Sequence, residues 1–301
     1  MSRGFGNIFG RRSPNYGGGR RRMGGMGGLG SSFKIRLFIA LAVAAFTYIS
    51  YLSSGTENPI TGETERVALS PDEEIAMGLR ALPQMTKQHG GLLNDPKAQA
   101  FIDELGQRLL EALPVYLKTK NISAANPYKF EFHLLADNRS INAFALPGGQ
   151  VFITKSLFDK LDSEAQVAGV IGHEIGHVLA RHGARRMANQ KLTQGLTQAV
   201  GMAGGGMETM RIAMMVGQMV NMKYGREDEL ESDRWGVRLT RWAGYDPNAM
   251  LKVMHVLEQA SGGSRTPEMM STHPKPANRR AYIKEVIQSE FPEGILAGLI
   301  Q

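Results

Sequence analysis

Two histidines four residues apart, His173 and His177, carry the clearest chemical signal in this sequence. On an α-helix this spacing places both imidazoles on one face, a turn apart, where they can bind one metal ion. Zinc accepts neutral imidazole ligands, and catalytic zinc sites keep one position for water. Glu174 follows the first histidine, so its carboxylate can reach that water and accept its proton. The segment HEIGH therefore predicts a zinc-dependent hydrolytic site.

A third metal ligand has to come from elsewhere in the chain. An acidic segment carries Glu229 and Asp233 four residues apart, so one carboxylate can bind the metal while the other orients a ligating imidazole. Spacing alone does not distinguish Glu229 from Glu231 as the ligand. His182 points to a different helix face, which favours a surface residue or a partner of a metal ligand. The chain has no Cys, so thiolate ligands are excluded.

Residues 163–182 are expected to form the helix that holds these histidines. Ser163 and Gln166 have the spacing of a capping box, and an apolar run follows them. Gly172 and Gly176 each cost about 1 kcal/mol in a helix interior. They indicate a close approach by another backbone or by substrate, or else simple helix packing.

The chain beyond residue 70 predicts one domain of mixed α and β structure in which helices predominate. Capping patterns place helix starts at Ser70 and Asp95. Residues 128–136 alternate in polarity and carry aromatic side chains, which predicts a strand. Residues 142–153 are predicted to form two extended pieces joined by a tight turn at Pro147-Gly148-Gly149.

The first 52 residues predict a basic tail followed by a membrane anchor. Residues 1–36 contain eight basic residues, no acidic residue and many glycines, a composition that predicts disorder. Residues 37–52 carry no charge and, at about 1.5 Å per residue, would span roughly 24 Å as a transmembrane helix. The basic side is expected to stay in the cytoplasm. Residues 53–69 then form a polar linker, and residues 70–301 the folded domain.

Other interpretations of the N-terminal segment remain open. A cleaved signal peptide is disfavoured by the long basic leader and by the absence of a small-residue cleavage site after the apolar run. A mitochondrial presequence is compatible with an Arg-rich segment free of acid. Without residues 1–36 the chain has 27 basic against 28 acidic residues, so its net charge of +7 comes from the tail. The folded part thus lacks the basic field that nucleic-acid binding requires.

Residues 194–222 hold seven of the 17 methionines together with a run of glycines. Methionine fills irregular gaps, so the segment is interpreted as core packing or as an adaptable flap that covers the cleft. Glu208 and Arg211 disfavour a second membrane span. A copper(I) site built from thioethers is a weaker alternative.

Three separated motifs carry a family resemblance: NAFALPGG at residues 142–149, HEIGH at 173–177 and EDELESD at 227–233. In this order they resemble the zinc metalloendopeptidase family of the CAAX prenyl protease and HtpX (Ste-type and Oma-type), in particular its single-anchor, BepA/LoiP/YcaL-like branch. The resemblance extends over roughly residues 70–287. It implies an α+β, mainly helical fold of the gluzincin type, with a small β-sheet whose edge strand faces the active-site cleft.

The resemblance also assigns roles to individual residues. It implies one zinc ion per chain bound by His173, His177 and Glu229, with Glu174 as the catalytic base. His273, in a Ser-Thr-His-Pro motif, is expected near the active site. There it would donate a hydrogen bond to the oxyanion or occlude the metal at rest, unless it is only a helix-start histidine.

Residues around the ligands receive supporting roles from the same resemblance. Asp233 is expected to orient a ligating imidazole, and Arg279 to orient substrate or pair with Asp233, unless it is a plain surface arginine. The NAFALPGG motif is expected to pair with the backbone of an extended substrate, which favours unfolded chains. Its residues expected to bind substrate are Asn142, Ala143, Phe144, Ala145, Gly148 and Gly149.

The resulting expectation is a membrane-anchored zinc endopeptidase that hydrolyses unfolded or misassembled proteins in protein quality control. It is expected in the bacterial inner membrane with its catalytic domain in the periplasm, or alternatively in the mitochondrial inner membrane. No nucleic-acid partner is expected, and the sequence does not define the oligomeric state. The alternative function is a non-cleaving, zinc-containing chaperone or adaptor that binds unfolded chains. Glu174 argues against it, because a structural zinc site does not need that carboxylate.

Overall fold

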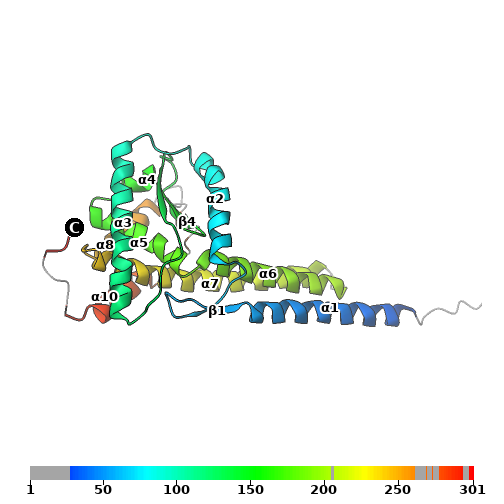
Figure 1. Ribbon diagram of the computed structural model, residues 1–301. Coiled ribbons are helices and arrows are strands. Elements are labelled where there is room, and N and C mark those ends of the chain that lie inside the picture. Colours follow the sequence, from blue (N-terminus) through cyan, green and yellow to red (C-terminus); the bar gives the residue numbers. More distant parts are fainter. Residues whose placement is uncertain (1–27, 205–206, 262–268, 270–272, 274–277, 294–297) are drawn as a thin grey trace, which may run out of the picture.

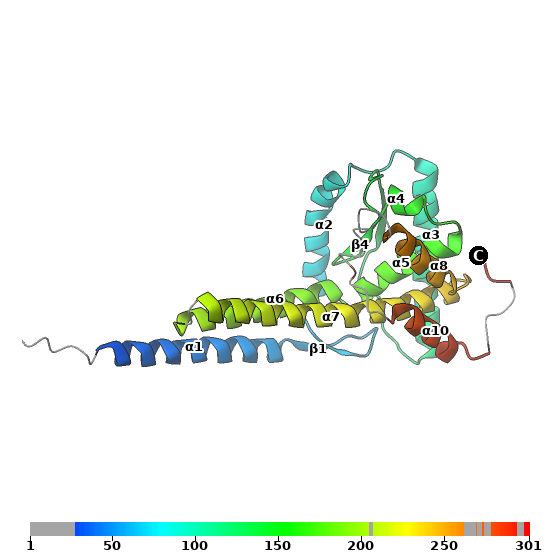
Figure 2. The same ribbon diagram turned by 180° about the vertical axis from the view of Figure 1, so that it is seen from behind.

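The computed structural model describes residues 28–204, 207–261, 269, 273, 278–293 and 298–301 of the 301-residue chain. A helical domain encloses a small sheet, and long helices project from it in one direction (Figures 1 and 2). The predicted tail, up to residue 27, lies outside the described residues. The named elements are α1 (Gly28–Ser53), β1 (Gly55–Glu57), β2 (Thr64–Arg66), α2 (Pro71–Gln88), α3 (Pro96–Thr119), β3 (Glu131–Leu135), β4 (Ala143–Leu146), β5 (Gln150–Thr154), α4 (Lys155–Phe158), α5 (Glu164–Leu179), α6 (His182–Met202), α7 (Met207–Trp242), α8 (Ala249–Ser261) and α10 (Arg279–Glu290).

The predicted α+β, mainly helical fold is confirmed. The main sheet has three strands in the order β3–β5–β4, in which β5 is parallel to β3 and antiparallel to β4. Every residue of the central strand β5 is buried. Strand β4 forms one edge of the sheet and contacts α5. The edge strand therefore runs past the helix that contains the HEIGH segment.

Helices α2 and α3 begin where the capping patterns predict. Ser70 Oγ accepts a hydrogen bond from the backbone N–H of Glu73, and the Glu73 carboxylate accepts one from the backbone N–H of Ser70. Asp95 caps α3 by accepting two hydrogen bonds from backbone N–H groups of the first turn. Helix α3 then packs an apolar face, with Leu109 fully buried, against α5 and α7.

Glycines allow α5 and α7 to pack closely. A Cβ atom on Gly176 would lie 2.8 Å from Trp235 Cβ and 3.2 Å from the Ser232 backbone. A Cβ atom on Gly172 would lie 3.4 Å from Gly236 Cα. A side chain at position 176 would push the helices apart, whereas a Cβ atom at position 172 would just reach van der Waals contact with α7. The close approach that the glycines predict is thus the approach of a neighbouring helix.

The turn between β4 and β5 requires glycine for two reasons. Gly148 and Gly149 have φ angles of 89° and 110°, in the left-handed region that favours glycine. In addition, a Cβ atom on Gly148 would lie 2.4 Å from Ile75 Cα in α2. The turn is therefore fixed by its backbone conformation and by its contact with α2.

Helix α1 is longer than the predicted anchor. Residues 28–36, assigned from composition to the disordered tail, already belong to the helix. No Gly or Pro interrupts the chain between Gly30 and Gly55, so the helix extends through the basic residues that precede the apolar run. Within it, Phe33–Ser53 is long and apolar enough to cross a membrane, and no other helix among the described residues meets these criteria.

The segment assigned to a polar linker contains a short hairpin. Strands β1 and β2 pair antiparallel, and the buried Asn58 lies between them in the chain. Its Nδ2 atom donates hydrogen bonds to Glu65 Oε1 and to the backbone oxygen of Leu179, both at 2.7 Å. These tertiary hydrogen bonds order a segment whose composition predicts an irregular chain. They also fasten the base of α1 to the end of α5.

The Met- and Gly-rich segment does not cover the cleft, so the flap interpretation is wrong for its described residues. It belongs to α6 and α7, which form a long helical hairpin beside α1 (Figure 1). The hairpin projects away from the domain because α6 and α7 continue as unbroken helices beyond their contacts with α5.

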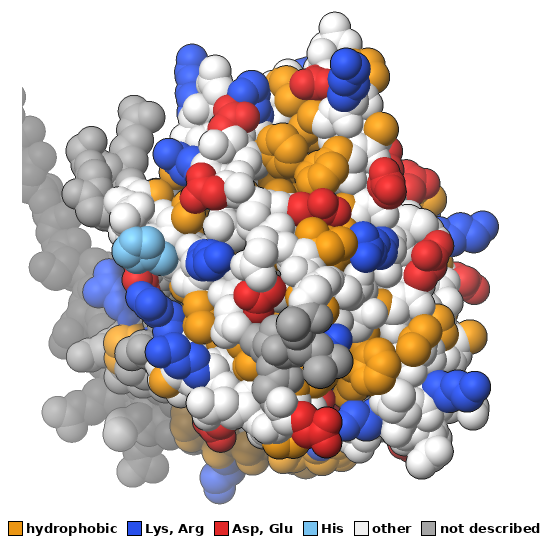
Figure 3. Space-filling model, turned by 90° about the vertical axis from the view of Figure 1, so that its left-hand side faces the viewer, with side chains coloured by type: hydrophobic (Ala, Val, Ile, Leu, Met, Phe, Trp, Pro, Cys, Tyr) orange, Lys and Arg blue, Asp and Glu red, His pale blue; other side chains and the backbone are white. Residues whose placement is uncertain are grey.

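Charged side chains are mixed on the surface of the domain. On the face in Figure 3, Lys and Arg side chains are interspersed with Asp and Glu side chains. This distribution agrees with the near-neutral charge of the chain outside residues 1–36.

Substitution of Gly148 tests the turn. We expect Gly148→Ala to lower the free energy of unfolding by roughly 2–5 kcal/mol, because left-handed strain adds to overlap with the α2 backbone. Gly62 provides a matched control, since its φ is 74° and a Cβ atom added there would have no other atom within 4 Å. Gly62→Ala should cost only about 1–2 kcal/mol. Urea unfolding of the detergent-solubilised chain, followed by tryptophan fluorescence, measures both; equal losses would contradict the packing argument.

Candidate metal centre and active-site cleft

Helix α5 presents His173 and His177 on one face, as their spacing predicts. Their Nε2 atoms are 3.1 Å apart. Glu229 of α7 faces both: its Oε2 atom lies 3.4 Å from His173 Nε2, and its Oε1 atom lies 3.4 Å from His177 Nε2. Glu231 instead contacts His182, at 3.0 Å. The geometry thus selects Glu229, and not Glu231, as the carboxylate beside the two imidazoles.

His273 completes a cluster of four side chains. Its Nδ1 atom lies 3.2 Å from His177 Nε2 and 3.0 Å from Glu229 Oε1. The histidine is buried, and its backbone N–H donates to the backbone oxygen of Met269. The expectation that His273 lies near the active site agrees with this placement. The other residues of its Ser-Thr-His-Pro motif lie outside the described residues.

The cluster has the dimensions and the charge that suit a zinc ion. The ligand atoms of His173, His177, Glu229 and His273 all lie within 4.8 Å of one another. Tetrahedral zinc with bonds of about 2.0–2.1 Å separates its ligand atoms by about 3.3 Å, close to the distances among these atoms. Burial opposes a positive charge on His173, but Asp233 and Glu229 outweigh it and raise its pKa to about 9. The same carboxylates favour a metal cation.

His177 and Glu229 are in the protonation states that metal binding requires. Burial lowers the pKa of His177 to about 3, so its imidazole is neutral near pH 7. Burial opposes ionisation of Glu229, but electrostatic attraction by His273 and hydrogen bonds from His173 and His177 hold its pKa well below its usual value. His177 therefore offers a neutral imidazole and Glu229 an ionised carboxylate, whereas His173 has to lose a proton when a metal binds.

Asp233 and Arg279 support His173 from behind. Asp233 Oδ1 lies 3.0 Å from His173 Nδ1, on the side away from the cluster. Arg279 donates hydrogen bonds of 2.7 and 2.6 Å to the two oxygens of Asp233 and lies 3.3 Å from Glu229 Oε2. Burial opposes ionisation of Asp233, but the charge of Arg279 and the hydrogen bond from His173 keep its pKa lowered. Of the two roles expected for Arg279, the geometry supports pairing with Asp233.

His182 supports His177 and is not a surface residue, since it is only 2% exposed. Its Nδ1 atom lies 2.7 Å from His177 Nδ1, and its Nε2 atom lies 3.0 Å from Glu231, which Arg185 also binds. When His177 Nε2 binds a metal, its proton is on Nδ1, so His182 accepts with Nδ1 and donates with Nε2. His182 thereby fixes the tautomer and orientation of His177.

A helix break that local sequence does not predict brings His182 into this position. Helix α5 ends at Leu179, and Arg181 adopts a left-handed conformation with φ of 53° before α6 begins. The Arg181 side chain donates hydrogen bonds to Glu74 at 3.1 Å and to the backbone oxygen of Leu69 at 2.5 Å. Contacts with distant segments thus hold a conformation that is unfavourable for a non-glycine residue.

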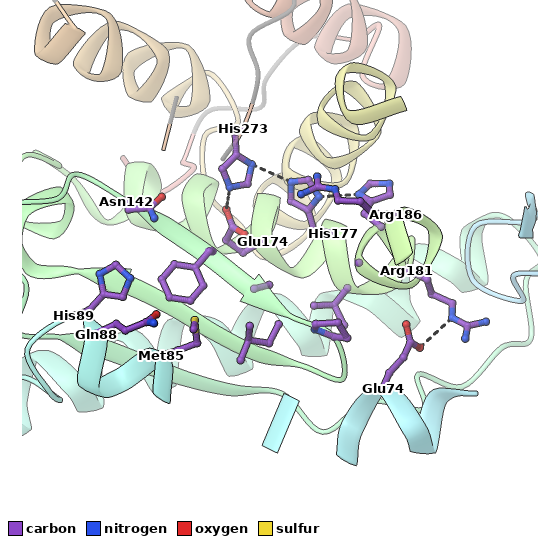
Figure 4. Close-up of a pocket in the computed structure, with 17 residues that line it drawn as sticks. Glu74, Met85, Gln88, His89, Asn142, Glu174, His177, Arg181, Arg186 and His273 are labelled. Carbon is purple, nitrogen blue, oxygen red and sulfur yellow. Dashed lines mark hydrogen bonds and ion pairs between the residues drawn. The ribbon is translucent and has the colours of Figure 1, made fainter. Parts of the chain in front are cut away.

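Glu174 faces a cavity next to the four-residue cluster. The carboxylate is 1% exposed, and neither oxygen has a hydrogen-bond partner among the described residues. Its Oε1 atom lies 3.6 Å from His273 Nε2. The cavity has a volume of about 300 Å³ and is also lined by His177 and His273 (Figure 4). A buried carboxylate without a hydrogen-bond donor is costly, so Glu174 is available to accept a hydrogen bond from a group that enters the cavity.

The edge strand β4 borders this cavity, as the sequence predicts. Asn142, Phe144 and Ala145 line it, and Ala143 is buried with its carbonyl oxygen 3.3 Å from His273 Nε2. Four of the six residues expected to bind substrate therefore lie in or beside the cleft.

Gly148 and Gly149 do not belong to the cleft. Neither glycine lines the cavity. A Cβ atom on Gly148 would meet α2, and one on Gly149 would lie 2.8 Å from the Lys129 backbone oxygen. Their place in the motif is explained by the turn and its packing, and a substrate contact is not needed.

Helix α2 supplies a further part of the cavity lining that the motifs do not indicate. Met85, Gln88 and His89 line the cavity from this helix end (Figure 4). His89 Nδ1 lies 2.9 Å from an oxygen of Asp137. No local pattern marks these residues, because only the tertiary fold brings α2 to the cleft.

Two histidines from an HExxH helix and a glutamate from a second helix, beside a cleft bordered by an edge strand, define a gluzincin-type metallopeptidase. The model of peptidase family M48 matches residues 99–287. The chain belongs to this family of metalloendopeptidases, which confirms the resemblance carried by the three motifs.

Relatives in bacteria and mitochondria show the same membership. The chain is 34% identical over 259 residues to the "Beta-barrel assembly-enhancing protease" of Escherichia coli (strain K12), a match of 81% of this chain and 50% of the relative. It is 35% identical over 233 residues to the protein of the same name from Yersinia pestis, a match of 73% of this chain and 45% of the relative. It is 25% identical over 279 residues to "Metalloendopeptidase OMA1, mitochondrial" of Bos taurus, covering 84% and 50%. The chain spans about half the length of these curated relatives.

The contact between His182 and His177 predicts an effect on metal affinity. We expect His182→Phe to weaken zinc binding by about 10- to 100-fold, because His177 loses the acceptor that orients it. His182→Gln, which keeps an acceptor, should lose less. Competition with a chromogenic chelator measures the affinity. His255→Phe is the control, since His255 is exposed on α8 and does not belong to the cluster. Unchanged affinity in His182→Phe would show that the contact does not support the metal.

Proposed function

We propose that this chain is a zinc-dependent endopeptidase that cleaves unfolded or misassembled protein chains in protein quality control. One observation carries the proposal. Glu174 lines the same cavity as His177, which forms a cluster with His173 and Glu229, and an edge strand borders that cavity. One zinc ion per chain, held by the two histidines and Glu229, suits this donor set.

Each group around the cavity has a separate role in peptide hydrolysis. Zinc, when bound, supplies a Lewis acid that polarises the scissile carbonyl and lowers the pKa of water towards 7. Glu174 accepts a proton from the attacking water and returns it to the nitrogen of the leaving amine. His273 is placed to donate a hydrogen bond to the carbonyl oxygen, or to occupy the metal at rest, because it adjoins both Glu174 and the cluster.

The edge strand suits an extended substrate. Strand β4 pairs with β5 on one side only and runs beside α5. A substrate segment that adds as a further strand would place its backbone along Asn142 to Ala145 and next to Glu174. A folded protein has no free strand to offer, so this mode of binding favours unfolded chains.

The N-terminal helix suits a membrane anchor. Phe33–Ser53 has the length and apolar composition of a membrane-crossing helix, and Lys34 and Arg36 lie at its N-terminal end. If the basic end stays in the cytoplasm, as positively charged flanks generally do, the catalytic domain lies in the periplasm of a bacterium. The mitochondrial inner membrane is the alternative. Bacterial relatives named for enhancing β-barrel assembly support a substrate that fails to assemble.

Glu174→Gln tests the assigned base. We expect casein cleavage to fall by about 10²- to 10⁴-fold, because the amide cannot accept the proton of water. Zinc content should stay near one ion per chain, since Glu174 is outside the ligand cluster. Casein hydrolysis and elemental analysis measure the two properties. Glu131→Gln, on an exposed residue of β3, is the control. Cleavage by Glu174→Gln at the wild-type rate would refute the assignment.

Removal of zinc tests the reaction class. Chelation with 1,10-phenanthroline should abolish casein cleavage by the detergent-solubilised chain, and added Zn²⁺ should restore it. Cleavage that persists after complete metal removal would contradict a metallopeptidase. A zinc-loaded chain that binds unfolded casein without cleaving it would instead support the alternative of a chaperone or adaptor.

A further inference from the structure

Large apolar side chains are exposed mainly on two neighbouring parts of the molecule. Of nineteen such side chains among the described residues, ten lie on α1 and five on the α6–α7 hairpin, whereas four are scattered elsewhere. A concentration of exposed apolar surface marks an interaction site. The five residues on the hairpin are Leu196, Met202, Met207, Met214 and Met215.

Helix α6 packs lengthwise against α1. Tyr51 donates a hydrogen bond of 2.7 Å to Asn189, and a Cβ atom on Gly195 would lie 2.4 Å from Thr47 Cγ2. Small residues at such a contact allow close approach and are typical of helix pairs in membranes. The residues of α1 that are least exposed recur with helical spacing on the side of this contact: Ala40, Val43, Ala44, Thr47 and Tyr51.

These contacts fix the position of α6 along α1. The two helices run antiparallel, so each residue after Gly195 lies level with a residue before Thr47, and Met202 lies about level with Ala40. At about 1.5 Å per residue, the stretch from Asn189 to Met202 extends roughly 20 Å. This is about two thirds of a hydrocarbon core of about 30 Å. A bilayer that surrounds α1 therefore also surrounds the end of α6.

The sequence of the hairpin suits this position. Between Lys191 and Lys223 the charged residues are Glu208 and Arg211. Both residues belong to the start of α7, near the tip of the hairpin. Measured along the axis of α1, they lie within about two helical turns of Arg36. A long basic side chain there can reach the headgroups by snorkelling. The two charges disfavour a complete second span, but they are compatible with a hairpin that enters and leaves on one side.

We propose that α6 and the first half of α7 form a re-entrant hairpin embedded in the bilayer beside α1, with the exposed Leu and Met side chains against lipid acyl chains. The inference rests on the proposed anchoring by α1. Lipid is the partner because the contacts with α1 hold the hairpin at membrane depth. Helical hydrogen bonding satisfies the backbone of the hairpin along this length, as the hydrocarbon region demands.

Site-directed spin labelling of the full chain tests the hairpin. The sequence has no Cys, so Phe46→Cys, Met202→Cys and Lys97→Cys each create a single labelling site. A label at position 46 reports the surroundings of α1, and a label at position 202 reports those of the hairpin. A label at position 97, which is exposed on α3, reports the surface of the domain. The labelled chains are reconstituted into phosphatidylethanolamine–phosphatidylglycerol vesicles. Collision rates with oxygen, which concentrates in lipid, and with a water-soluble nickel chelate then measure the depth of each label. Retained casein cleavage shows that each variant is folded.

We expect the ratio of oxygen to nickel collisions at Met202 to resemble that at Phe46 and to exceed that at Lys97 by at least about tenfold. Burial in protein lowers both collision rates, so a raised ratio is specific for lipid. A water-like ratio at Met202 with a lipid-like ratio at Phe46 would overturn the hairpin and leave the anchor intact. A water-like ratio at Phe46 would overturn the anchor, and the hairpin with it, but not the zinc chemistry.

Discussion

The close packing of α5 against α7 is the constraint on which the metal centre depends. Two imidazoles on α5 can share an ion with a carboxylate on α7 only if the helix axes approach closely. Gly176 and Gly236 favour this approach, since added Cβ atoms would lie 2.8 Å from Trp235 Cβ and 3.3 Å from the His173 backbone nitrogen. Each glycine costs helix stability of about 1 kcal/mol. The packing of the rest of the domain offsets this cost, since α3 buries an apolar face on both helices and α8 packs against α5. The glycines thus make the helices less stable but allow the side chains of the cluster to lie close together.

Charge balance is the second requirement of a buried metal site, and the two histidines of α5 meet it differently. His173 is supported by Asp233, whose charge is compensated by Arg279. His177 contacts the neutral ring of His182. The negative charge is on Glu231, which contacts His182 rather than His177 and is paired with Arg185. Burial, and then the positive charge of Arg185, hold the pKa of His182 well below its usual value, which keeps it an acceptor for His177. Each imidazole therefore has a defined tautomer without an uncompensated buried carboxylate behind it.

The parts of the site that could be predicted are those set by local geometry. The spacing of His173 and His177 on one helix, and of Glu229 and Asp233 on another, depends only on helical periodicity. The choice between Glu229 and Glu231 depends on how α7 is rotated against α5, which packing decides. His182 is harder to place from sequence, because helical periodicity holds only while the helix continues. The break at Arg181 is stabilised by Glu74 and Leu69, more than a hundred residues away in the sequence.

The hairpin of α6 and α7, which packs along α1 through α6, also supplies residues of the candidate metal centre. Helix α6 begins with His182, which contacts a ligand, and then packs against α1 through Gly195. Helix α7 leaves the same hairpin and carries Glu229 further along. The contact of His182 with His177, the carboxylate of Glu229 and the packing against α1 therefore all belong to one helical hairpin, although they are far apart along it.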